Sequence, residues 1–124
     1  MAFDVLDGPN MPKPLGPYSQ AIRAAGLIFV AGQPGLHPDT GAVAATFEEQ
    51  ARQAFENLGA VLHASGSSMA KVVKTTIFLA DQAKFPELNA LYREFFPERP
   101  PVRSTPVVAL PRGLLISIDC IAVA

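Results

Sequence analysis

The order of apolar and polar residues indicates short strands in the first third of the chain. Residues 21–24 and 27–31 are mostly apolar and flank Ala25-Gly26, a pair that favours a turn, so they predict a β-hairpin. The next segment, 32–41, is dense in glycine, proline and aspartate and predicts a loop without regular structure.

Two later segments have the periodicity of amphipathic helices. Residues 46–49 have the spacing of a capping box, in which the Thr46 hydroxyl and the Glu49 carboxylate satisfy free backbone N–H groups at a helix start. We expect this helix to end near Ser65-Gly66, because glycine takes the left-handed conformation that closes many helices. The second helix should end before the proline-rich segment 97–101. The predicted buried stripes are Ala51, Ala54, Phe55, Leu58, Val61 and Leu62 in the first helix, and Phe85, Leu88, Tyr92 and Phe95 in the second.

The remaining segments read as strands and define the fold class. Residues 72–79 are rich in β-branched side chains, and two more strands are expected at 104–108 and 114–123. The order β, β, α, β, α, β, β predicts an α+β sandwich with both helices packed on one face of the sheet.

The last predicted strand indicates what each face of the sheet contacts. Its even positions, from Leu114 to Ala122, are all apolar and suit the helix side, whereas its odd positions, from Leu115 to Val123, are mixed. A mixed second face is typical of a subunit interface that contains a cleft. We therefore expect a homo-oligomer with sites between subunits.

Composition limits the class of protein. A length of 124 residues with 49% hydrophobic content fits one domain, residues 1–124. A net charge of −1 gives no basic excess for phosphates or anionic membranes, so nucleic acid is a disfavoured partner. The N-terminus lacks the basic and apolar regions of a signal peptide, and no apolar run approaches the roughly 20 residues that span a bilayer. With a single cysteine as well, we expect a cytoplasmic protein without membrane contact.

Several common kinds of catalytic site find no support in the pattern. His37, His63 and Cys120 fall in a turn, a helix and a strand without the close pairing of zinc ligands, so we expect no metal. No serine lies in a nucleophile-elbow pattern, and no glycine loop of the phosphate-binding type is present.

Arg103 is the residue that best fits ligand binding. It follows the rigid Pro100-Pro101 at the start of a predicted strand, so its guanidinium is well placed to meet a carboxylate with two parallel hydrogen bonds. An isolated arginine of this kind is more often a solvated surface residue. Tyr18 is likewise more often a packed turn aromatic, and Asn89 a solvent-facing helix residue.

Six blocks in order along the chain resemble the RidA (YjgF/YER057c) family of imine deaminases. They lie at 16–21, 30–33, 50–58, 73–79, 89–96 and 101–105. The resemblance implies a chorismate-mutase-like sandwich, with two helices on one face of a mixed sheet, assembled as a homotrimer with three clefts between subunits. Members hydrolyse reactive enamines and imines, such as 2-aminoacrylate and 2-iminopropanoate, to 2-keto acids and ammonia without a cofactor.

The resemblance also implies roles for individual residues. Arg103 binds the carboxylate of a small imine, enamine or keto acid, and Gly32 offers backbone polar groups. Tyr18 and Asn89 line the cleft and orient substrate or water. Thr105 occupies a position where many members carry a cysteine.

Two departures from the family pattern bear on catalysis. Ser117 replaces the glutamate that positions or activates the attacking water in deaminating members. A serine is no general base at neutral pH unaided, and losing such a group typically costs about 10²- to 10⁴-fold in rate. Asp119, about 6.6 Å further along the same strand face, either recruits the water instead or makes an interfacial hydrogen bond. Ala31 replaces the serine before Gly32, which removes a hydroxyl from the cleft wall.

Three functions are therefore considered for a chain with these residues. The leading hypothesis is a deaminase of the 2-iminobutanoate/2-iminopropanoate type. The alternative, supported by Ser117, is a family member that keeps the carboxylate-binding cleft as a ligand-binding or regulatory trimer, or that acts on another substrate. An endoribonuclease or translation inhibitor is disfavoured by the acidic balance and by the lack of a histidine or lysine pair suited to RNA cleavage.

Overall fold

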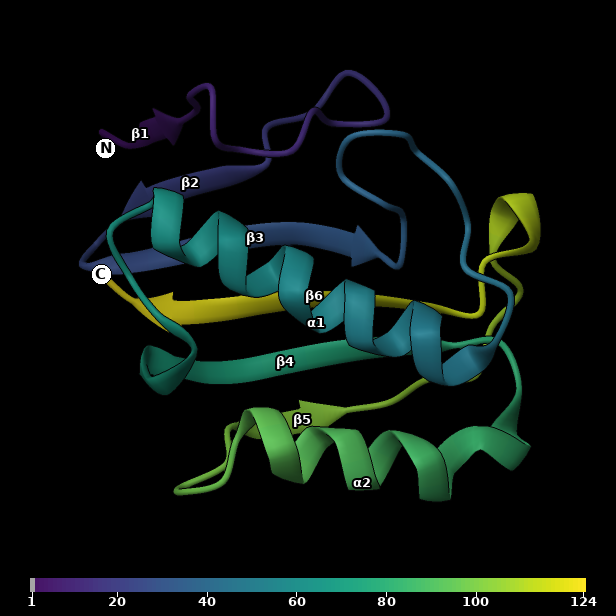
Figure 1. Ribbon diagram of the computed structural model, residues 1–124. Helices are drawn as coiled ribbons and strands as arrows, with labels where there is room; N and C mark the ends of the chain where they lie inside the picture. Colours follow the sequence, from purple (N-terminus) through teal and green to yellow (C-terminus); the bar gives the residue numbers. More distant parts are fainter. Residues whose placement is uncertain (1) are drawn as a thin grey trace.

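Six strands form one mixed sheet in the computed structural model, which describes residues 2–124 (Figure 1). The strand order is β1-β2-β3-β6-β4-β5, and every neighbouring pair is antiparallel except β4 and β5. Parallel strands need a long crossover, which α2 supplies here. The elements are β1 (Asp4–Leu6), β2 (Ala21–Ala24), β3 (Leu27–Pro34), α1 (Phe47–Ala64), β4 (Val72–Leu79), α2 (Phe85–Phe95), β5 (Val102–Ser104) and β6 (Ile116–Val123), with short 3₁₀ turns at Met69–Lys71, Gln82–Lys84 and Pro111–Gly113.

Both helices lie on the same face of the sheet, which confirms the predicted α+β architecture (Figure 1). The first helix begins after Thr46, whose Oγ1 accepts a hydrogen bond of 3.2 Å from the Glu49 backbone N–H. The Glu49 carboxylate accepts from the Thr46 hydroxyl at 3.0 Å rather than from a backbone N–H, so only half of the capping box is formed as predicted. Gly66 follows the helix with φ +82°, as expected for its end.

The alternation predicted for the last strand is confirmed. The even positions of β6 are buried beneath the helices, and the odd positions from Leu115 to Ile121 are partly exposed on the other face. The core between helices and sheet includes Phe55, Leu58 and Leu62 of α1 and Leu88, Leu91 and Tyr92 of α2. Of these, Leu91 was not part of the predicted stripe.

The sheet face away from the helices is here called the open face, and it carries a register row that is apolar except at Lys74. Residues paired in register share a face, and one register row crosses all six strands. Phe29 and Val102 in this row are 41% and 67% exposed. The row consists of Val5, Ile22, Phe29, Ile121, Lys74 and Val102.

The strands of the structure differ from the expected ones in four places. Residues 32–34 are not a loop, because a bulge between Val30 and Gln33 takes up Gly32 and lets β3 resume pairing with β6. In place of the strand expected at 104–108, the structure has β5, which is three residues long and ends at Ser104. Pro106 has no N–H with which to extend the ladder, and only a bridge from Val107 to Leu79 follows. The strand β1 was not predicted, and β6 begins two residues later than expected.

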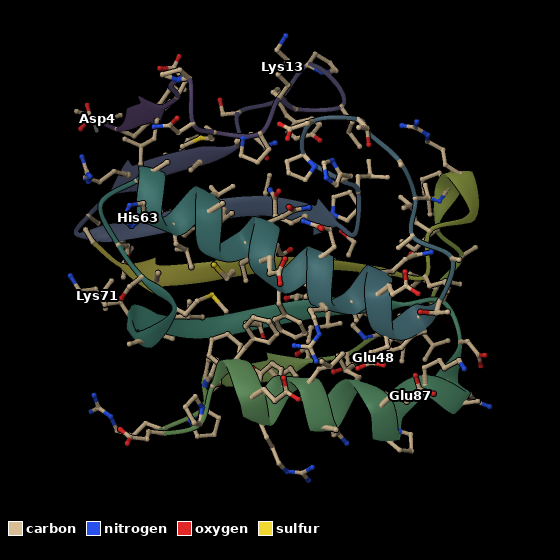
Figure 2. The ribbon with its side chains drawn as sticks, in the orientation of Figure 1. Asp4, Lys13, Glu48, His63, Lys71 and Glu87 are labelled. Atoms are coloured by element: carbon tan, nitrogen blue, oxygen red, sulfur yellow. The ribbon has the colours of Figure 1, made fainter. Side chains whose placement is uncertain are left out.

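Charged side chains lie around the outside of the molecule. The six labelled in Figure 2 are all exposed and come from both helices, from β1, from the loop after β1 and from the 3₁₀ turn before β4. Within residues 2–124, no helix combines the length and the apolar character needed to cross a membrane.

Candidate functional site

Gly32 and Ser117 contact each other where β3 bulges away from β6. A Cβ built on Gly32 would lie 2.8 Å from the Ser117 Oγ, closer than such atoms approach in proteins. Any side chain at position 32 would therefore force the Ser117 side chain to move. The structure brings together these two predicted site residues through strand pairing alone.

A pair of buried amides holds the bulge that carries Gly32. The Gln33 side chain donates hydrogen bonds to Gln20 Oε1 at 2.8 Å and to the Ala31 carbonyl at 3.0 Å, and it is only 2% exposed. Gln20 in turn donates to the Pro12 carbonyl at 3.0 Å. Neither glutamine was singled out from the sequence, although both lie in the segments that resemble the family. The available signal in the sequence was their place in the segments 16–21 and 30–33.

Tyr18 lies on the same side of the molecule as the bulge. Its side chain is 44% exposed, and its hydroxyl accepts a hydrogen bond of 3.0 Å from the Leu15 backbone N–H. Together with Gly32 it lines a cleft of about 720 Å³ between the N-terminal loop, the loop after β3 and α1. Tyr18 therefore has the turn contact that the sequence suggested and also borders a cleft.

Asp119 lies opposite the bulge on the open face. Its neighbours in β6 pair with Val30 and Gln33, so Ala31 and Gly32 bulge across from it, and Thr76 of β4 pairs with it on the other side. Burial raises the pKa of the Asp119 carboxyl above its ordinary value, although hydrogen bonding to Thr76 and the charge of Lys74 oppose this. A carboxyl with a raised pKa is suited to proton exchange closer to neutral pH.

Arg103 lies on the opposite side of the sheet. Its register partner in β4 is Thr75, which is buried and faces the helices. The Arg103 Cζ lies 4.8 Å from the centroid of the Tyr92 ring, and no ion pair joins Arg103 to any residue that the structure describes. The hydrogen-bond donors of Arg103 are thus not used by an acidic side chain of its own chain.

Asn89 lies on α2, the helix whose Tyr92 ring contacts Arg103. It is partly buried on α2, one turn before Tyr92, so the two residues share a side of the helix. Thr105 follows β5 directly and is also partly buried. The predicted site residues thus fall into two groups. One lies at α2 and β5 and consists of Arg103, Asn89 and Thr105. The other lies around the β3 bulge and consists of Tyr18, Ala31, Gly32, Ser117 and Asp119.

The two groups do not meet within one chain. Arg103 lies on the edge strand β5 and faces the helices with its register partner Thr75, whereas Ser117 lies on β6 and faces the open side. Between these strands lies β4. Within one chain, Arg103 and Ser117 therefore face opposite sides of the sheet.

The structure assigns no nucleophile or metal ligand among the remaining candidates. His37 and His63 are exposed, and Cys120 is buried, with a pKa raised to about 12 by burial and by the neighbouring Asp119. Across residues 2–124, no three histidine, cysteine or acidic side chains gather in the arrangement of a metal site. The His37 Nδ1 instead accepts backbone hydrogen bonds from Asp39 and Thr40 in its own turn.

Comparison with known proteins gives consistent matches over almost the whole chain. The sequence model of the family described as endoribonuclease L-PSP matches residues 8–124. The chain is 47% identical over 121 residues to Reactive Intermediate Deaminase A, chloroplastic, of Arabidopsis thaliana, covering 96% of this chain and 65% of the length of that protein. It is 41% identical over 121 residues to the 2-iminobutanoate/2-iminopropanoate deaminase of Mus musculus, covering 96% and 90% of the two chains. The crystal structure of E. coli TdcF with bound serine is similar with a TM-score of 0.90 and 34% identity, covering 98% of each chain.

Proposed function

The chain belongs to the endoribonuclease L-PSP family, which includes the RidA deaminases, and from this membership we propose that it hydrolyses 2-iminobutanoate, 2-iminopropanoate and similar imines to 2-keto acids and ammonia. Relatives named as deaminases of reactive intermediates support a general role of this kind. The observation that carries the specific proposal is Arg103, whose guanidinium is partly exposed at a sheet edge and pairs with no described acidic residue.

Arg103 is suited to the common feature of these substrates, an α-carboxylate. A guanidinium and a carboxylate form two parallel hydrogen bonds, which fix both the position and the plane of the bound group. The bound serine of TdcF also carries an α-carboxylate, which supports the same ligand chemistry in this chain. Asn89 and Thr105 are placed to contact the rest of a ligand held by Arg103.

The complete site is proposed to form between copies of the chain. The open face carries a row that is apolar on five of the six strands, with Lys74 on β4, and that includes the exposed Phe29 and Val102; burial of its apolar part favours association. We place a second copy against this face, in a chorismate-mutase-like homotrimer with three clefts. Arg103 of one copy then faces the group around Gly32 and Ser117 of the next.

The reaction needs water at the imine carbon and proton transfer at the nitrogen. Water adds to C2 as the C=N electron pair moves to nitrogen, which takes a proton. The resulting carbinolamine passes its hydroxyl proton to the nitrogen, and ammonia leaves as the C–N bond breaks and the C=O bond forms. Backbone groups at Gly32 and the Tyr18 hydroxyl orient the reactants in this proposal. Asp119, with its raised pKa, exchanges the proton in place of the glutamate that Ser117 replaces.

A direct assay tests this proposal. Purified protein is given 2-iminobutanoate or 2-iminopropanoate generated in situ, and keto acid release is compared with buffer and with Arg103→Ala. Release that is faster than in buffer and lost in Arg103→Ala supports the deaminase. Release no faster than either control overturns it.

Ser117 favours a second candidate function, a cleft that binds a carboxylate ligand without hydrolysing an imine. Its short side chain fits against Gly32 and offers no general base. Ser117→Glu, with Ser117→Ala as the matched control, separates the two functions. Activity that appears only in Ser117→Glu supports the binding protein, whereas a fast wild type excludes it.

A further inference from the structure

Arg103 has a platform beneath it that no sequence pattern indicated. An arginine side chain on an edge strand is long and flexible, and binding a carboxylate requires it to be held in one orientation. The Tyr92 ring lies 4.8 Å from the Arg103 Cζ, within the range of a cation–π contact. Such a contact covers a face of the guanidinium and leaves the N–H groups at its edges free for a ligand.

The Tyr92 ring is itself fixed from several sides. Its hydroxyl lies 2.9 Å from the Oγ1 of Thr75, and Thr75 is the residue that pairs with Arg103 in register. Its ring contacts Phe96 and Phe55 at centroid distances of 4.8 and 6.1 Å, and only 7% of the residue is exposed. Burial raises the pKa of the Tyr92 hydroxyl, so it stays protonated and keeps its hydrogen bond at physiological pH.

We propose that Tyr92 is a positioning residue that holds the Arg103 guanidinium ready for the carboxylate of the ligand. This inference rests on the proposed function, because it assumes that Arg103 binds that carboxylate. Tyr92 does not touch the ligand. It acts by reducing the number of orientations that Arg103 must give up when the ligand binds.

The chain offers a matched set of variants for this proposal. Tyr92→Leu removes the ring but keeps apolar bulk, and Tyr92→Phe keeps the ring without its hydroxyl. Phe95→Leu is the control, since Phe95 is on the same helix and stacks on Phe55 at 4.8 Å without contacting Arg103. Arg103→Ala tests the proposed function itself.

The experiment measures binding of 2-oxobutanoate and of its neutral amide, 2-oxobutanamide, to each full-length variant by calorimetry. We expect Tyr92→Leu to weaken 2-oxobutanoate binding by about 3- to 20-fold, the range of a partly desolvated cation–π contact. Tyr92→Phe and Phe95→Leu should stay within about 2-fold of wild type, because both keep the ring under Arg103. Binding of the amide should change little in all three.

The outcomes separate the positioning role from the proposed function. If Arg103→Ala binds 2-oxobutanoate as well as wild type, the proposed carboxylate site is wrong and the role of Tyr92 falls with it. If Arg103→Ala loses binding but Tyr92→Leu does not, only the positioning role is overturned. Equal losses in Tyr92→Leu and Phe95→Leu, or equal losses for acid and amide, would show a merely structural role and also overturn it.

A measurement on wild type covers the case in which Tyr92→Leu does not fold. The Arg103 Nε–H resonance is assigned by NMR in the free protein. A position over the Tyr92 ring predicts an upfield ring-current shift that Phe95→Leu leaves in place. A resonance at the frequency of a solvated arginine would overturn the proposal.

Discussion

The backbone of Gly32 approaches the Ser117 side chain so closely that a Cβ on residue 32 would lie 2.8 Å from the Ser117 Oγ. This contact joins the bulge of β3 to β6 at Ser117. It also means that Gly32 and Ser117 are coupled, so substitutions at one depend on the other.

Gly32→Ala is expected to destabilise the protein by about 1–3 kcal/mol, the usual range for overpacking at a close contact. Adding Ser117→Ala removes the Oγ that the new methyl group meets and should restore most of the loss. Urea unfolding of the four proteins in this cycle measures the coupling. A double variant as unstable as Gly32→Ala alone would show that the contact is not the cause.

Gln33→Leu is expected to loosen the same bulge from the opposite side. It removes two hydrogen bonds and leaves the buried Gln20 Oε1 without its donor, which costs about 1–3 kcal/mol. The effect should appear as faster amide hydrogen exchange at Ala31 and Gly32. Glu56→Leu, at an exposed position of α1, is the control and should leave that exchange unchanged. Unchanged protection in Gln33→Leu would contradict the role assigned to this amide.

Asp119 gives the folding stability a predictable pH dependence. Burial raises its folded-state pKa above the ordinary 3.8, so the folded protein binds this proton more tightly than the unfolded chain does. Its contribution is therefore favourable below pH 3.8 and is lost as the pH rises through the folded pKa. We compare the wild type with Asp119→Asn, which does not titrate at this position. Between pH 3.8 and the folded pKa, the free energy of unfolding of the wild type should fall relative to that of Asp119→Asn, and above the folded pKa the difference should stay constant.

Urea unfolding of both proteins between about pH 3 and 7 checks this sign. Lys74→Met provides a second comparison. Because Lys74 lowers the Asp119 pKa, its removal should extend the pH range over which stability is lost to higher pH. A wild type that gains stability relative to Asp119→Asn as the pH rises would contradict the assigned shift.

Cys120 is expected to be unreactive in the folded protein. It is buried on the helix face of β6, and its pKa of about 12 leaves almost no thiolate at neutral pH. Ellman's reagent should label it only after unfolding in guanidinium chloride. Labelling of the native protein within minutes would show that the strand opens or that the thiol is accessible.

Local patterns along the chain predicted much of the fold. The first helix was placed correctly because its Thr46 cap and the Gly66 stop are encoded within a few residues of its ends. The strand at 72–79 was placed to the residue by its β-branched side chains. Val107 and Val108 have the same propensity, yet they do not form a strand. The extent of β5 is set by its parallel register with residues 74–76 of β4, a contact between distant segments.

The candidate site was predictable only in part, because some of its contacts join segments that are distant in the sequence. Gly32 and Ser117 were both singled out from the family motifs, and the structure places them in contact. Tyr92 was assigned to a core stripe, because helical periodicity shows which face is buried but not which side chain of another element lies above it. The Arg103–Tyr92 contact arises from the packing of α2 against the edge strand β5.

If two copies of the chain complete one deaminase site, as proposed, then mixing two inactive variants should restore activity. Arg103→Ala removes the carboxylate contact, and Tyr18→Asp places a repelling charge at an exposed position of the other group. In a mixed trimer with clefts between copies, one cleft keeps both native residues. Co-expressed variants should therefore recover about a quarter of wild-type keto acid release from 2-iminobutanoate, from random assembly of a three-fold ring. A mixture no more active than the two variants assayed separately, beside an active wild type, would contradict the shared site.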